Sequence, residues 1–178
     1  WMSEWFVDEI VEVIPSEKSE QEWTDVVDWL FVKAVDSLWA FPQWTKMVVT
    51  PVEEDQVFDL VNDAINANVT KVKAVDITFW YEWEEIEPEL PINVTIRAYN
   101  SEPQVVVHID DGENVEEIDA SIYGKTANFE ANGFSIYVIA EISRLLVNFY
   151  NGENVVMSGY VKSTGEVESL VYDPGVWE

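Results

Sequence analysis

Residues 72–83, VKAVDITFWYEW, alternate in polarity with a period of two, which is the spacing of side chains on the two faces of a β-strand. The more apolar face carries Val75, Ile77, Phe79, Tyr81 and Trp83. The other face carries Asp76, Thr78, Trp80 and Glu82. This stretch therefore predicts a strand with one face toward a hydrophobic core.

Three more segments downstream continue the same alternation. They cover residues 92–98, 105–109 and 118–122. A loop with Pro88 and Pro91 precedes the first of them, and Asp111-Gly112 is a strong hairpin-turn signal before the last. Together with 72–83, these segments predict an antiparallel meander with one solvated face.

Helical spacing of apolar residues predicts three helices outside the meander. The first covers residues 19–38 and begins with a capping box at Ser19–Glu22. The second begins at Thr50-Pro51 and extends to Asn66. The third covers residues 134–150, and Asn151-Gly152 is suited to its C-terminal end.

The ends of the chain add two further segments. Residues 155–161 and 167–172 flank a Ser-Thr-Gly turn and predict a closing hairpin, whereas residues 2–14 fit a strand or a helix equally well. The expected fold class is α+β, an antiparallel meander sheet with helices packed on one face and a C-terminal β-hairpin. We expect a single domain over residues 2–178, with Met2 as the natural start and Trp1 preceding it.

Charge is the most unusual property of the composition. The chain has 35 acidic and 9 basic residues, a formal net charge of −26. It is also 48 % hydrophobic and 13 % aromatic, so it has the means to bury a core, unlike an acidic disordered chain. An anionic folded surface favours a cationic partner. Because the lysines and arginines are scattered singly, direct binding to nucleic acid or to anionic lipid is disfavoured.

Several classes of site lack the residues they require. The chain has no cysteine, so it has no disulfide or thiolate site, and no apolar run approaches the roughly 20 residues of a membrane span. No signal peptide is recognised, which leads us to expect a location in the cytoplasm of a host cell.

No motif in the sequence predicts catalysis or cofactor binding. His108, the single histidine, is expected to be an ordinary strand residue, since no nucleophile-elbow pattern accompanies it. Asp110, Asp111 and Glu113 around Gly112 fit a tight turn better than a cation site. We therefore expect no catalytic, cofactor-binding or metal-binding residues, and a protein that is not an enzyme.

Two acidic clusters and one tryptophan are the predicted partner-binding residues. They are Glu82, Glu84, Glu85, Glu87, Glu89, Asp110, Asp111, Glu113, Glu116, Glu117, Asp119 and Trp80. Carboxylates on the same face of a strand lie about 6.6 Å apart, and this spacing approximates the track of phosphates along a nucleic-acid strand. Between Ala74 and Gly124 the only basic residue is Arg97, so this part should be the most negative.

The aromatic residues divide into two groups. Those expected in the core are Trp23, Phe79, Tyr81, Trp83, Phe134 and Phe149. Those less easily placed inside are Trp29, Trp39, Trp44, Trp80 and Trp177. Exposed aromatics beside acids suit an arginine-rich partner through cation–π contacts, and the same rings could stack on sugars.

The composition and size look like those of phage or mobile-element proteins that block host restriction or CRISPR enzymes. The leading hypothesis is an acidic inhibitor, a DNA mimic of the anti-restriction or anti-CRISPR kind that occupies the basic nucleic-acid-binding surface of such an enzyme. One alternative is an immunity protein or acidic chaperone that binds a basic protein. Another is a salt-adapted or secreted enzyme or sugar-binding domain, whose acids serve solvation. A symmetric homodimer would double the anionic surface.

Overall fold

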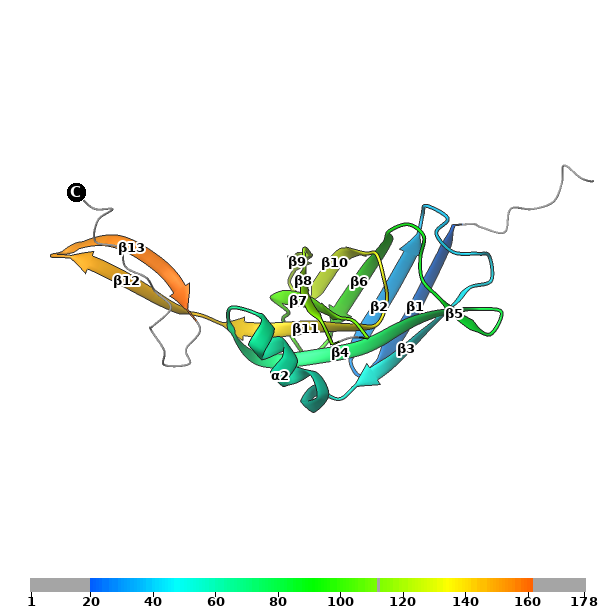
Figure 1. Cartoon of the computed structure of the whole chain (residues 1–178), viewed down its shortest axis with the longest axis horizontal. Coiled ribbons are helices and arrows are strands. Elements are labelled where there is room, and N and C mark those ends of the chain that lie inside the picture. The colour runs from blue at the N-terminus through cyan, green and yellow to red at the C-terminus, as the bar shows by residue number, and fades with distance from the viewer. Residues whose placement is uncertain (1–19, 112, 162–178) are drawn as a thin grey trace, which may run out of the picture.

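Most strands bury every second residue, and this alternation builds a two-sheet sandwich (Figure 1). The structure is a computed structural model that describes residues 20–111 and 113–161. The first sheet has the order β1 (Gln21–Val27), β2 (Leu30–Asp36), β6 (Ile92–Ala98), β10 (Thr126–Ala131) and β9 (Ser121–Tyr123). The second has the order β3 (Lys46–Val52), β4 (Asn68–Tyr81), β11 (Ile136–Ser143), β7 (Val105–Ile109) and β8 (Val115–Ile118), and β5 (Glu84–Ile86) also pairs with β4.

The main core lies between the two sheets. Val32 of β2 and Ile96 of β6 are opposite each other in the first sheet, and both are fully buried. Val75, Ile77 and Phe79 of β4 enter the same cluster from the second sheet. The predicted apolar face of residues 75–79 is therefore the face that points into the sandwich.

The second sheet is covered on its outer face as well. The helix α2 (Glu54–Ala64) buries Val57 and Val61 against Val72 and Ala74 of β4, in a second core cluster. This helix was predicted, but its first residue is Glu54 rather than Thr50-Pro51, which belong to β3. Since β3 is an edge strand of its sheet, it tolerates a proline.

The α+β prediction is wrong, because the described residues are mostly strand and α2 is the only helix among them. Residues 19–38 were expected to be a helix, and their described part contains the hairpin of β1 and β2. Leu30, Val32 and Ala34 are buried with a period of two, which the helical pattern had concealed. Residues 134–150 contain β11 and most of β12 (Leu145–Asn151) instead of a helix.

The single meander is also wrong, although its strands at 92–98 and 105–109 are confirmed. The segments 72–83 and 105–109 lie in the second sheet, whereas 92–98 lies in the first. The segment 118–122 is divided between the end of β8 and the start of β9. The chain thus crosses between sheets where a meander would have continued within one.

The strand predicted at 155–161 exists as β13 (Asn154–Val161), but its partner is β12. Asn151-Gly152, expected to end a helix, instead contains the last residue of β12 and the first residue of the Gly152-Glu153 turn that joins these two strands, where Gly152 adopts a positive φ of 65°. The β12–β13 hairpin extends away from the sandwich in Figure 1. Residues 2–14 and 167–172 lie outside the described residues.

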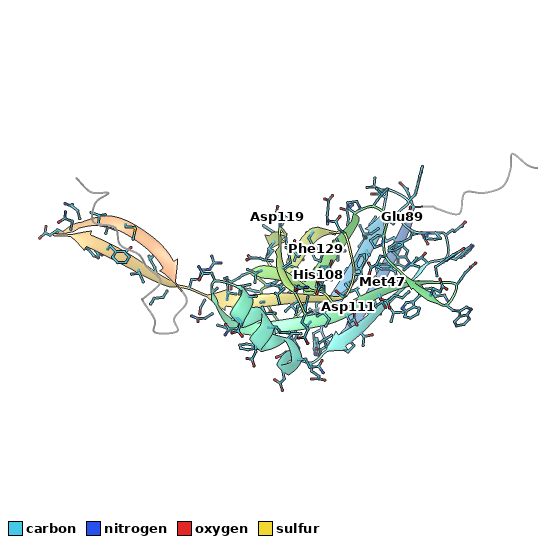
Figure 2. The ribbon with its side chains drawn as sticks, in the orientation of Figure 1. Met47, Glu89, His108, Asp111, Asp119 and Phe129 are labelled. Atoms are coloured by element: carbon cyan, nitrogen blue, oxygen red, sulfur yellow. The ribbon has the colours of Figure 1, made fainter. Side chains whose placement is uncertain are left out.

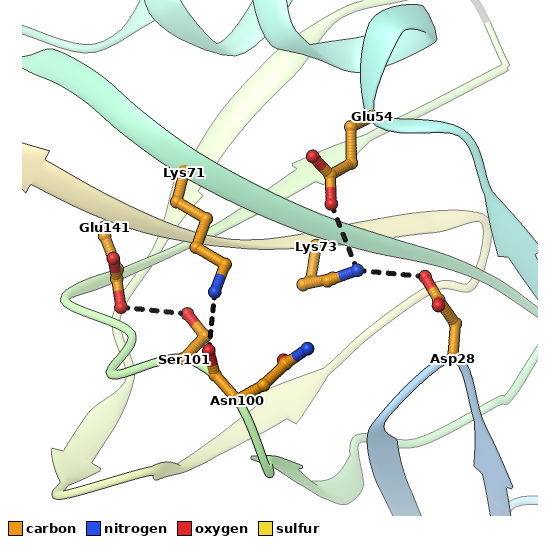
Figure 3. Close-up of polar contacts among 7 residues, drawn as sticks. All are labelled: Asp28, Glu54, Lys71, Lys73, Asn100, Ser101 and Glu141. Atoms are coloured by element: carbon orange, nitrogen blue, oxygen red, sulfur yellow. Dashed lines mark hydrogen bonds and ion pairs between the residues drawn. The ribbon is translucent and has the colours of Figure 1, made fainter.

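Two charged groups, the buried Asp36 and the partly buried Lys73, fix connections near the sandwich edges. Asp36 is 0 % exposed, and its carboxylate accepts hydrogen bonds from the N–H groups of Ala40 (2.8 Å) and Phe41 (2.9 Å). Lys73 of β4 forms ion pairs with Asp28 (3.2 Å) and Glu54 (3.0 Å), as Figure 3 shows. The lysine thereby links the β1–β2 turn to the start of α2.

Candidate functional site: an acidic groove lined by tryptophans

The outer face of β3, β4 and β5 forms a groove of about 740 Å³. Its lining residues are Trp44, Lys46, Val48, Thr50, Asp76, Thr78, Trp80, Glu82, Trp83 and Glu85. Three tryptophans and three carboxylates thus share one surface with a single lysine. Large exposed apolar groups gathered in this way are typical of binding surfaces.

The groove continues the face of β4 that α2 covers. Val72 and Ala74 of this face pack under α2, and the next residues with the same orientation are Asp76, Thr78 and Trp80. The registers Thr50↔Asp76 and Lys46↔Trp80 place β3 beside them. The helix therefore covers one part of the sheet and leaves the adjoining part to the groove.

Two of the tryptophans are held on turns in an unfavourable backbone conformation. Trp83 follows Glu82 in the two-residue turn between β4 and β5, and their φ angles are 70° and 49°. Trp44 precedes β3 with a φ of 73°. Residues other than glycine rarely adopt this left-handed backbone conformation, and such backbone strain is often found at functional sites. Trp83 is 97 % exposed and Trp44 79 % exposed, so core packing does not explain either residue.

The third tryptophan has a fixed orientation. The Trp80 indole Nε1–H donates to Thr78 Oγ1 at 2.9 Å, so both polar partners lie within the groove. Glu85 is directly opposite Trp80 in the β4–β5 register. A rigid aromatic ring beside a carboxylate is an arrangement that binds cations.

Electrostatics at the groove floor disfavour further negative charge. Burial, and then the nearby Asp111, raise the pKa of Asp76 above its ordinary value. Burial also raises the pKa of Glu87, with contributions from Glu85 and Asp111, although the hydrogen bond from Phe134 N–H opposes this shift. The carboxylates at this end of the molecule therefore repel one another, and a bound cation would relieve the repulsion.

The first predicted acidic cluster is only partly gathered at the groove. The groove is lined by Glu82 and Glu85, together with the predicted Trp80. Glu84 precedes Glu85 on β5, so its side chain faces the opposite way. Glu87 accepts a hydrogen bond from Phe134 N–H at 2.9 Å and so has a structural role. Glu89 lies in the following loop, where its N–H donates to Ala40 O.

The second predicted cluster is spread over the β7–β8 region. Asp110 accepts hydrogen bonds from the Asn114 N–H and side-chain amide, and Glu113 N–H donates to Asp110 O, so this segment is a turn. Glu116 and Glu117 are successive residues of β8 and point to opposite faces.

Asp111 and Asp119 lie at opposite ends of that cluster. Asp119 connects β8 with β9, and Figure 2 shows it well apart from Asp111 and from Glu89. The twelve predicted residues therefore form no single track, and Asp111 is the member of the second cluster that influences the groove electrostatically.

His108 has structural partners. Its Nε2 lies 2.8 Å from Ser135 Oγ, and its ring stacks on Tyr137 at 4.5 Å. Because the Ser135 hydroxyl donates its one proton to Ile109 O at 2.7 Å, the imidazole must donate to the serine. The serine is thus not activated as a nucleophile by this histidine. Burial lowers the pKa of His108, despite the opposing effect of Glu116, Asp110 and Asp111.

The described part of the chain has neither a metal-binding cluster nor a membrane-spanning helix. No group of three or more histidines and carboxylates in residues 20–111 and 113–161 is placed to hold a metal ion. None of the helical structure in that part of the chain is long and apolar enough to cross a membrane.

Of the ten residues that line the groove, only Trp80, Glu82 and Glu85 were among the predicted partner-binding residues. Trp83 was assigned to a core face but is exposed, and Asp76 was not singled out. The alternation in 72–83 already placed Asp76, Thr78 and Trp80 on one non-core face, which was the available signal. The contribution of β3 was hidden because Thr50-Pro51 resembled a helix start.

The comparisons with known proteins gave no relatives: no family model matches the chain, and no curated protein or solved structure has significant similarity to it.

Proposed function

We propose that this chain is a non-catalytic binding protein that occupies the basic nucleic-acid-binding surface of a host defence or DNA-processing enzyme, as an acidic mimic of nucleic acid. The observation that carries the proposal is the groove, where Asp76, Glu82 and Glu85 lie among three tryptophans with one lysine. Carboxylates provide attraction for a basic surface, and desolvated aromatic rings provide the anchoring contacts.

The charge of the whole molecule supports the same proposal. Among the described residues, the recorded ion pairs use only Lys33 and Lys73, which contact Glu22, Asp28 and Glu54. With a net charge of −26, most of the acids keep their field in solvent. Such a field accelerates association with a cationic surface and is screened by salt. The proposed setting is the cytoplasm of the host cell, and a symmetric homodimer would extend the anionic surface.

A capture experiment tests the proposal. The tagged protein is incubated with a host-type lysate at low salt, and bound proteins are eluted by a salt step or by duplex DNA. The expected result is one nucleic-acid enzyme that both treatments release. Capture of a basic protein that duplex DNA does not displace would instead identify an immunity protein or acidic chaperone.

Variants make the same experiment specific to the groove. Glu82→Gln with Glu85→Gln removes two charges at the groove, and Asp59→Asn with Asp63→Asn removes two from exposed positions on α2. Capture should weaken for the groove pair and persist for the helix pair. Equal capture by both pairs would mean that net charge alone, rather than this surface, selects the partner.

A sugar-binding module is a second candidate, because Trp44, Trp80 and Trp83 line one open groove and such rings also stack on sugars. Titration of the tryptophan fluorescence with neutral soluble polysaccharides distinguishes it. A saturable change that is insensitive to salt would favour sugar binding over nucleic-acid mimicry. An enzyme adapted to high salt is distinguished by unfolding at low salt, where a mimic should remain folded.

A further inference from the structure

We propose that the groove binds an arginine side chain of the partner, with the guanidinium paired to Asp76 and stacked on the tryptophans. This inference rests on the proposed function, because it names the chemical group of the cationic partner that the groove selects. Three observations lead to it: an unpaired carboxylate, a fixed aromatic ring and an excess of negative charge.

Asp76 is the first observation. It is partly buried on the outer face of β4, and within the described ranges the influences on its carboxylate are burial and the like charge of Asp111, with no hydrogen-bond donor or counter-charge. Its ladder neighbours there are Thr50 of β3 and Ile136 of β11, neither of which carries charge. A partly desolvated carboxylate without a partner is costly, so a cation that reaches it is stabilised more than one bound at an open surface.

The aromatic rings are the second observation. Trp80 is fixed by its hydrogen bond to Thr78, and Trp83 and Trp44 extend into solvent from turns with left-handed backbones. Trp is the aromatic side chain that binds cations best, and desolvation of the pair increases the strength of this contact. Trp83 and Trp44 would be removed from solvent only when a partner covers them.

The balance of charge selects the occupant. Three carboxylates and one lysine line the groove, so a neutral sugar would leave the Asp76 carboxylate without a counter-charge. An ammonium group would pair with it but is compact and strongly hydrated. A guanidinium is planar, pairs with a carboxylate through two parallel hydrogen bonds and stacks on aromatic rings. Arginine is therefore the side chain that satisfies both elements of the groove.

The test uses short blocked peptides that differ at one residue, which is arginine, lysine or citrulline. Citrulline keeps the shape of arginine but has no charge. Binding to the full chain is measured by calorimetry and by tryptophan fluorescence. The arginine peptide should bind at least about tenfold more tightly than the citrulline peptide, because the charged pair is lost in the latter. It should also bind more tightly than the lysine peptide.

Asp76→Asn is the decisive variant, with Asp59→Asn on α2 as its charge-matched control. Asp76→Asn should weaken the arginine peptide by at least about tenfold, and Asp59→Asn should leave it within about twofold. Near-UV circular dichroism confirms that each variant is folded. Equal affinities for arginine and citrulline, or equal effects of the two variants, would overturn the inference.

The outcomes separate this inference from the proposed function. If lysate capture and duplex competition succeed while Asp76→Asn has no effect on the arginine peptide, the arginine site is wrong and the mimic stands. If the peptide binds through Asp76 but duplex DNA never displaces the partner, the arginine site stands and mimicry is wrong. Binding of a neutral oligosaccharide that Asp76→Asn leaves unchanged would overturn the arginine assignment in favour of a sugar.

Discussion

Replacement of Trp83 by glycine is expected to stabilise the fold and to weaken partner binding. Trp83 has a φ of 70° and is 97 % exposed, so it contributes strain and almost no burial. An L-residue in the left-handed region costs about 1–2 kcal/mol, which glycine does not incur. Glycine in turn loses about 0.5–1 kcal/mol more conformational entropy on folding. The difference is a net stabilisation of about 0.5–1 kcal/mol.

Urea unfolding followed by far-UV circular dichroism measures this change without relying on tryptophan fluorescence. Trp29→Gly is the matched control, because Trp29 has a φ of 65° in the two-residue β1–β2 turn and does not line the groove. Trp83→Gly should be more stable than the parent and bind the partner less tightly, whereas Trp29→Gly, which also loses packing because Trp29 is only 64 % exposed, should bind the partner as tightly as the parent does. A loss of stability in Trp83→Gly would refute the strain argument, and unchanged binding would remove Trp83 from the site.

Three other perturbations have expected outcomes. Asp36→Ala should lower the free energy of unfolding by about 2–5 kcal/mol, because the buried N–H groups of Ala40 and Phe41 each lose their acceptor, and Asp36→Asn should recover part of it in the same urea assay. Because burial lowers the pKa of His108 in the folded state, the unfolded state binds more protons as the pH is lowered through about 6.5, so the free energy of unfolding should decrease as the pH is lowered through that range. His108→Gln should flatten the slope, and an unchanged slope would contradict this assignment. Raising the ionic strength from about 0.01 M to about 0.15 M should raise the melting temperature of the free protein and weaken capture of its partner, since the Debye length shortens from about 30 Å to about 8 Å; melting that does not depend on salt would mean that self-repulsion is unimportant.

The strand β11 was mistaken for part of a helix because both of its faces are covered. A continuous apolar run is compatible with a buried helix or with a strand covered on both faces. In β11, Val138 and Ala140 pack in the cluster beneath α2, whereas Tyr137 and Ile139 pack inside the sandwich. Residues 136–140 are therefore all hydrophobic, and no period of two is visible there in the sequence.

The β1–β2 hairpin was concealed differently. Its turn is Asp28-Trp29, which lacks the glycine that usually marks a two-residue turn with positive φ angles. Without that signal, apolar residues from Trp23 to Leu38 matched helical spacing as well as alternation. Pairing with β6 in the first sheet decides for the strand, and that contact is more than fifty residues distant along the chain.

Properties that depend on local pattern and composition could be predicted before the fold was known. These are the core face of residues 75–79, the helix that became α2, the anionic charge, and the exposure of Trp29, Trp39, Trp44 and Trp80. The pairing of the strands, which brings Trp44, Asp76 and Trp83 into one groove, became evident only from the folded chain. Alternation fixes the face on which a side chain lies, whereas the choice of neighbour depends on long-range packing that no local period encodes.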